Sequence, residues 1–140
     1  MKYTKLLLCG VILALGIFSC GKNDDSPLSI VGKWNIVRSV DIETSSSIRD
    51  TITTIYKQGS YIDFQKNGTV SLNLIDDSGT TYTDTATYTV VPNGVNILVD
   101  NDTEFYEIKK LTSSELTIYL KDDFNNGAGD LQETYIYANK

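Results

Sequence analysis

The segment Tyr61–Ile75, YIDFQKNGTVSLNLI, alternates apolar and polar residues on both sides of an Asn-Gly pair. Successive side chains of a β-strand point to opposite faces, so this alternation predicts two strands, each with one apolar and one polar face. Asn67-Gly68 tolerates the positive φ angles that a tight turn between antiparallel strands requires. The segment therefore predicts a β-hairpin whose apolar face carries Ile62, Phe64, Val70, Leu72 and Leu74.

The same period of two continues through the chain from Ile30 onward. Thr, Val, Ile and Tyr are frequent, and no long amphipathic helix fits the pattern. Turn residues, among them Asn93-Gly94, Asp76–Gly79 and Asp100–Asp102, separate the apolar runs. The expected strands are Gly32–Ile42, Ile48–Tyr56, Tyr61–Gln65, Thr69–Ile75, Tyr82–Val91, Val95–Val99, Phe105–Leu111, Leu116–Lys121 and Gln132–Ala138.

These strands predict one all-β domain over residues 30–140. One apolar and one polar face fit either a β-sandwich or a closed barrel. Eight or nine antiparallel strands joined as a meander favour a small up-and-down barrel, because closure removes the exposed edges of an open sheet.

The composition argues against several classes of function. A net charge of −6 disfavours binding to the phosphate backbone of nucleic acids. The chain has no histidine, which removes the commonest zinc ligand and the usual general base. Both cysteines, Cys9 and Cys20, precede the barrel domain. We therefore expect no catalytic residues, no metal site and no cofactor, and hence no enzyme.

The N-terminus predicts a signal peptide over residues 1–19. Lys2 and Lys5 precede the uncharged run Leu6–Phe18, which is shorter than the roughly twenty residues of a membrane-spanning helix. Ser19-Cys20 directly after this run resembles the lipobox of bacterial lipoproteins. The resemblance implies cleavage before Cys20, a diacylglyceryl thioether on its sulfur and an acyl chain such as palmitate on its amine.

Residues 20–29 then form a short polar tether between the lipid and the domain. Within it, Lys22–Asp25 resembles the signal that sends Bacteroidetes lipoproteins to the cell surface, although a solvated linker has the same composition. We expect the protein to be held by its N-terminal lipid in the outer membrane, on the periplasmic or the cell-surface face.

The barrel domain also resembles a known family. Gly32-x-Trp34 is similar to the Gly-x-Trp signature of lipocalins. Ile62–Thr69, Ala86–Val90 and Tyr106–Ile118 resemble segments of the small lipocalin-like domains of Bacteroidetes lipoproteins. The resemblance implies that Gly32 and Trp34 form the closed base of the barrel, with Trp34 beneath a basic side chain from near the last strand. The last strand has no arginine, and Lys140 is the basic residue nearby.

The family resemblance implies non-catalytic binding of a small apolar or amphipathic molecule in the barrel. A barrel of this size is either filled by its own side chains or holds one small ligand. Two alternatives stay open: a protein-interaction or inhibitor module that uses the rim loops 43–60 and 122–131, and carbohydrate binding by exposed tyrosines. The candidate cavity residues are Ile62, Phe64, Leu72, Leu74, Tyr88, Val90, Ile97, Leu116 and Ile118.

Overall fold

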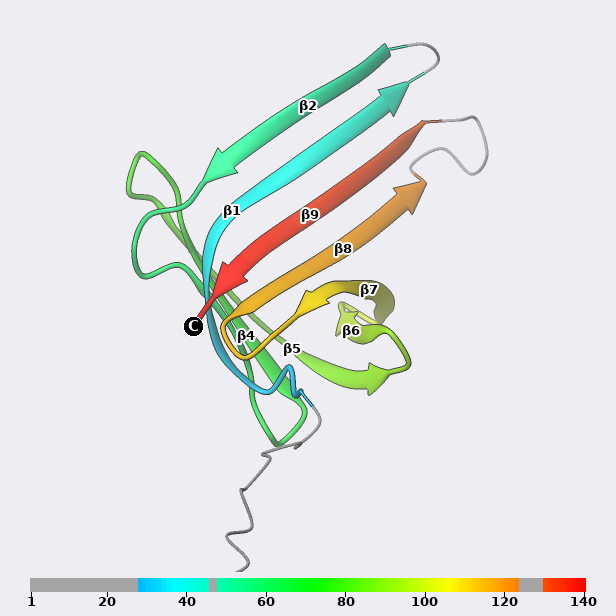
Figure 1. Ribbon diagram of the computed structural model, residues 1–140. Helices are drawn as coiled ribbons and strands as arrows, with labels where there is room; N and C mark the ends of the chain where they lie inside the picture. Colours follow the sequence, from blue (N-terminus) through cyan, green and yellow to red (C-terminus); the bar gives the residue numbers. More distant parts are fainter. Residues whose placement is uncertain (1–27, 46–47, 124–129) are drawn as a thin grey trace, which may run out of the picture.

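The computed structural model describes residues 28–45, 48–123 and 130–140, and within these ranges the chain forms nine β-strands and no helix (Figure 1). The predicted signal peptide, Cys20 and most of the predicted tether lie outside the described residues. No helix with the length and hydropathy of a membrane span occurs in the part of the chain that the structure describes. The strands are β1 Gly32–Ser45, β2 Ile48–Ile55, β3 Tyr61–Phe64, β4 Thr69–Ile75, β5 Thr81–Val91, β6 Gly94–Val99, β7 Asp102–Leu111, β8 Glu115–Asp123 and β9 Leu131–Asn139.

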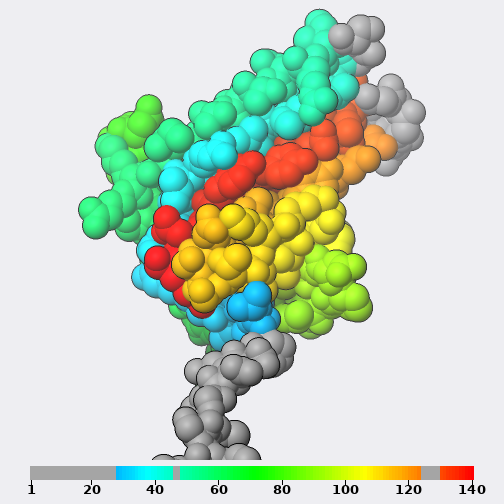
Figure 2. Space-filling view, in the orientation of Figure 1, coloured from blue at the N-terminus to red at the C-terminus, as the bar shows by residue number. Residues whose placement is uncertain are grey.

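Eight of these strands close into an antiparallel barrel. From β3 to β9 each strand pairs with the next one in sequence, and β9 pairs with β1 to complete the circle. Figure 2 shows β9 in red packed between β1 in cyan and β8 in orange, so the wall is continuous at the point of closure. The expected barrel is confirmed, and the sandwich alternative is wrong.

The ninth strand, β2, leaves the expected meander because β1 serves two neighbours on one edge. Gly32–Asn35 of β1 pairs with β3, whereas Arg38–Ser45 pairs with β2. The pairing between β1 and β9 shifts register between Ile36 and Arg38, which marks a β-bulge where β1 changes partner. The meander expectation is therefore wrong for β2 and β3, which do not pair with each other.

The β1–β2 hairpin also corrects the expectation of a rim loop over residues 43–60. β1 continues to Ser45 and β2 begins at Ile48, so most of this region is strand. In Figure 1, β2, β1, β9 and β8 run side by side as one sheet that extends to one side of the molecule. Of the other expected rim loop, 122–131, the described residues include the end of β8 and the start of β9, and 124–129 lie outside them.

The turn between β5 and β6 shows why Gly94 is a glycine. Val91 pairs with Gly94, so the turn consists of Pro92 and Asn93 rather than the expected Asn93-Gly94. Asn93 supplies the positive φ of 64°. A Cβ atom on Gly94 would collide with the carbonyl oxygen of Tyr106 on β7. Gly94 is thus required by the close approach of β7, not by the turn.

The hydrophobic core lies inside the barrel. It comprises twelve buried residues from Ile30 to Ala138, and Trp34 and Phe64 are fully buried within it. Every strand of the barrel and every described core residue lie between residues 28 and 140. We therefore expect this part of the chain to fold as one unit.

Candidate ligand-binding site

Two small cavities lie inside the barrel. The first, here called the central cavity, has a volume of about 120 Å³ and is lined mainly by aliphatic side chains of β3–β6, β8 and β9. The second, the β1 cavity, has a volume of about 130 Å³ and lies against β1, β4, β9 and Tyr56. Leu72 and Ile136 line both, so the two cavities are neighbours separated by these half-buried side chains.

The structure brings part of the predicted cavity set together around these spaces. Ile62, Ile97 and Ile118 line the central cavity, Leu74 lines the β1 cavity, and Leu72 lines both. Phe64, Tyr88 and Leu116 are buried but line neither cavity; they belong to the packed core. The rings of Phe64 and Tyr88 meet edge to face with centroids 5.1 Å apart.

The prediction for Val90 is wrong, because its side chain is 62% exposed. Alternation places Val90 on the same face of β5 as the buried Tyr88. However, the pairing of β4 with β5 ends at Thr69 opposite Thr87. Beyond this point β5 has a neighbouring strand only on the β6 side, and nothing covers Val90.

The base of the barrel is built around Trp34. Its indole Nε1 donates a hydrogen bond of 2.7 Å to the carbonyl oxygen of Ile30. The ammonium of Lys140 lies 4.2 Å from the centre of the Trp34 ring, which is a cation–π contact. Gly32 has a φ of +123°, a backbone conformation that residues other than glycine rarely adopt. The fully buried Trp34 is thus covered by a basic side chain, Lys140, which directly follows the last strand.

The β1 cavity has a polar wall that the sequence reasoning missed. Asp41 on β1 accepts a hydrogen bond of 2.7 Å from the Thr134 hydroxyl and one of 3.4 Å from the Ser39 hydroxyl. The Ser39 hydroxyl also lies 3.3 Å from that of Tyr56. Simple alternation from Ile36 places Ser39 and Asp41 on the outer face. The β-bulge between Ile36 and Arg38 adds one residue and so moves both side chains to the inner face.

A hydrogen bond between β7 residues lies at the edge of the central cavity. The hydroxyl of Tyr106, which lines this cavity, donates to Glu104 at 2.7 Å. Burial raises the pKa of Tyr106, and the bond to Glu104 raises it further. Tyr106 therefore stays protonated and remains a donor throughout the physiological range of pH.

A cleft of about 570 Å³ lies between β7 and β8. Their pairing ends at Glu107 opposite Tyr119, and beyond it the two strands separate (Figure 1). The cleft is lined mostly by polar and charged side chains, including Glu104 and Asp122. It resembles a gap in the barrel wall more than a binding pocket, since such pockets are mainly apolar.

Three tyrosines gather on the outer face of β8 and β9. The rings of Tyr119 and Tyr135 lie 4.7 Å apart at an angle of 46°. The next tyrosine along β9, Tyr137, carries the guanidinium of Arg38 at 3.8 Å above its ring. The Tyr119 hydroxyl donates to Glu133 at 2.8 Å. This outer tyrosine cluster is half-buried, and sequence alone did not reveal that its members are neighbours.

The described residues contain no group of three or more acidic, histidine or cysteine side chains placed to hold a metal ion.

Comparison with known proteins identifies a matching family. The model of the family described as "Lipocalin-like domain" matches residues 30–118. No curated protein matches the sequence. A lipocalin-like protein from Bacteroides uniformis is similar in structure, with 12% identity, a TM-score of 0.45 and coverage of 76% of this chain and 94% of its own.

Two further solved structures are similar to this chain. A protein from Bacteroides eggerthii shows 12% identity, a TM-score of 0.47 and coverage of 80% of this chain and 100% of its own. Apocrustacyanin C1 shows 14% identity, a TM-score of 0.44 and coverage of 83% of this chain and 63% of its own. Because the family model spans well over half of the sequence and most of the barrel, this chain belongs to the lipocalin-like domain family.

Proposed function

We propose that this protein binds a small apolar or amphipathic molecule inside its barrel, without catalysis, while an N-terminal lipid on Cys20 anchors it in the bacterial outer membrane. The observation that supports binding is the pair of adjoining cavities, whose walls are mainly aliphatic with a few fixed polar groups. Ligand sites in proteins have this composition.

The size of the cavities narrows the class of ligand. Each measures little more than 100 Å³, against about 300–1,000 Å³ for typical small-molecule sites. Displacement of the half-buried side chains of Leu72 and Ile136 would join them into one narrow space. An unbranched chain fits such a space better than a fused ring system does.

Titration of residues 28–140 with 1-octanol, followed by NMR of the backbone amides, tests the binding. We expect saturable shifts at Leu72, Ala86 and Ile136. The variant A86L fills the central cavity and should weaken octanol binding at least tenfold. T87L, at the exposed neighbouring position on β5, should leave it unchanged. Absence of saturable shifts, or equal binding by A86L, would contradict the proposed site.

Anchoring has its own test, in which the full chain is expressed in a Gram-negative host. The wild type should fractionate with membranes and incorporate labelled palmitate. The variant C20S should lose the label and be released from the membrane. Retention of C20S in membranes with an unchanged label would refute lipidation at this cysteine.

The outer tyrosine cluster supports carbohydrate binding as a second candidate function. Neighbouring rings of Tyr119, Tyr135 and Tyr137 provide apolar surface beside polar groups, and such surfaces suit the faces of sugar rings. A glycan array probed with the wild type and Y135A tests this function, with Y82A, at an exposed tyrosine outside the cluster, as the control. A signal that Y135A abolishes and Y82A retains would favour it.

A further inference from the structure

We infer that the molecule bound in the barrel carries a positive charge, and that Asp41 is the residue that anchors it. This inference rests on the proposed binding function and names its ligand class: an amphipathic amine, with a short apolar chain and one ammonium group. It follows from the β1 cavity, from the register of the barrel and from the distribution of the basic side chains.

Among the residues that the structure describes, Asp41 is the one charged group that lines the β1 cavity. The remaining wall consists of the aliphatic side chains of Ile36, Leu72, Leu74 and Ile136, with hydroxyl groups beside the carboxylate. Asp41 is half-buried, and a carboxylate partly removed from water beside apolar walls is stabilised when a cation or further donors approach it. No basic side chain lines either cavity among the residues that the structure describes.

The hydroxyls around Asp41 orient its carboxylate without neutralising it. Thr134 donates to one oxygen at 2.7 Å, and Ser39 donates to the other at 3.4 Å. Two ionised carboxylate oxygens accept about four hydrogen bonds in total, so each oxygen retains capacity for a further donor. An ammonium group supplies three donors and a full charge. The β1 cavity thus offers a positioned anion next to apolar walls.

The register places further carboxylates on the same inner surface. Asp84 on β5 lies opposite Leu72 and lines the central cavity. Glu104 on β7 lies opposite Ile97 and accepts the Tyr106 hydroxyl. Asp84 is exposed and Glu104 is half-buried, so both add partly screened negative charge to that of Asp41, and we expect the cavities to favour cations over carboxylate ligands such as fatty acids.

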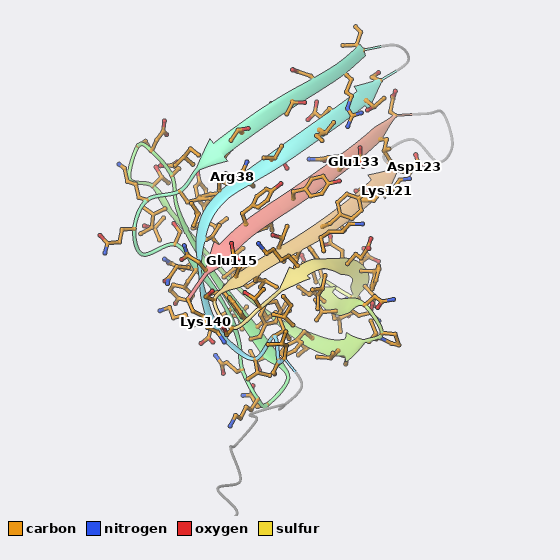
Figure 3. All side chains as sticks on the ribbon, viewed as in Figure 1. Arg38, Glu115, Lys121, Asp123, Glu133 and Lys140 are labelled. Atoms are coloured by element: carbon orange, nitrogen blue, oxygen red, sulfur yellow. The ribbon has the colours of Figure 1, made fainter. Side chains whose placement is uncertain are left out.

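The basic side chains, by contrast, contact groups outside the cavities. Arg38 and Lys109 lie over tyrosines of the outer cluster, Arg49 pairs with Glu133, and Lys140 covers the base at Trp34. Figure 3 shows Arg38 beside the end of β2 and Lys140 at the end where β9 terminates. These basic side chains thus lie outside both cavities, whereas the carboxylates of Asp41 and Asp84 line them.

Three probes with the same chain and different head groups test the inference on residues 28–140: octylammonium, 1-octanol and octanoate at pH 7, followed by NMR of the backbone amides. We expect octylammonium to bind at least tenfold more tightly than octanol, and octanoate to bind more weakly than octanol. In D41N, which keeps an acceptor for Thr134, octylammonium should fall to the affinity of octanol, whereas octanol binding should not change.

E115Q is the matched control, because it also removes one negative charge but does so at the start of β8, away from the β1 cavity (Figure 3). There Glu115 pairs with Lys110 at 2.8 Å. E115Q should leave all three affinities unchanged. Equal affinities of octylammonium and octanol in the wild type, or an undiminished preference in D41N, would overturn the inference while leaving the binding function intact. The wild-type comparison needs no variant, so it decides the question even if D41N does not fold. Failure of all three probes to bind would overturn both.

Discussion

Ile118 and Val90 show how the surroundings of a residue decide its contribution. Both are branched aliphatic residues that alternation assigns to the inner face of a strand. Ile118 is 1% exposed because β7 and β9 flank it on both sides, whereas Val90 is 62% exposed at the end of β5. The period of two identifies a face, but burial depends on whether the opposite wall reaches that face.

This difference predicts different costs of truncation. I118A should lower the free energy of unfolding by about 2–5 kcal/mol, because it removes buried methyl groups and leaves a cavity. V90A should lower it by less than about 0.5 kcal/mol, as substitutions at exposed positions do. Urea unfolding followed by Trp34 fluorescence measures both. Similar costs for the two variants would show that the position of Val90 is buried in solution.

Lys140 is expected to stabilise the base through the face of Trp34. The contact is at the surface, where a cation–π interaction contributes about 0.5–1 kcal/mol. In urea unfolding, K140Q should have a free energy of unfolding that is lower by this amount. K140R should keep the wild-type value, because arginine also binds aromatic faces. Equal stability of K140Q and the wild type would argue against a contribution from the lysine charge.

At the scale of strands, β8 and β9 carry a hydrogen-bonded pair on their outer face. Burial and, next in size, the hydrogen bond to Glu133 together raise the pKa of Tyr119 to about 12. The protonated phenol is thus favoured in the folded state. Its contribution to stability is fully present below pH 10, the ordinary tyrosine pKa, and is lost as the pH rises through about 12.

E133Q removes the carboxylate and should lower the pKa of Tyr119. The Cζ chemical shift of Tyr119, followed by NMR as a function of pH, reports its titration. We expect the midpoint in E133Q to lie below that of the wild type. E115Q, distant from Tyr119 on the same strand, should leave the midpoint in place. An unchanged titration in E133Q would mean that burial alone sets this pKa.

At the scale of the molecule, closure by β1 and β9 couples all strands around one core. Such a domain should unfold in a single cooperative transition. We expect the urea transition of residues 28–140 to have the same midpoint by far-UV circular dichroism and by Trp34 fluorescence. Separate midpoints would indicate that the extended sheet of β2, β1, β9 and β8 melts independently of the base.

Local rules were sufficient for the class of fold, because alternation and turn chemistry act between neighbours in sequence. All nine strands occur close to where alternation, for example of Ile62, Phe64, Leu72 and Leu74, places them. The barrel is favoured over the sandwich because closure removes exposed edges. The Gly32-x-Trp34 signature likewise pointed to the base. Lipidation at Cys20 remains a prediction.

Contacts between distant segments decided the rest. The bulge near Val37 gives β1 two partners, brings Asp41 beside Thr134 and turns it toward Leu74; none of these residues is near the others in sequence. The size and charge of a cavity depend on which side chains meet across the barrel. Alternation within one strand does not say which side chains of other strands it will face. The β1 cavity and its carboxylate are therefore visible only in the tertiary structure.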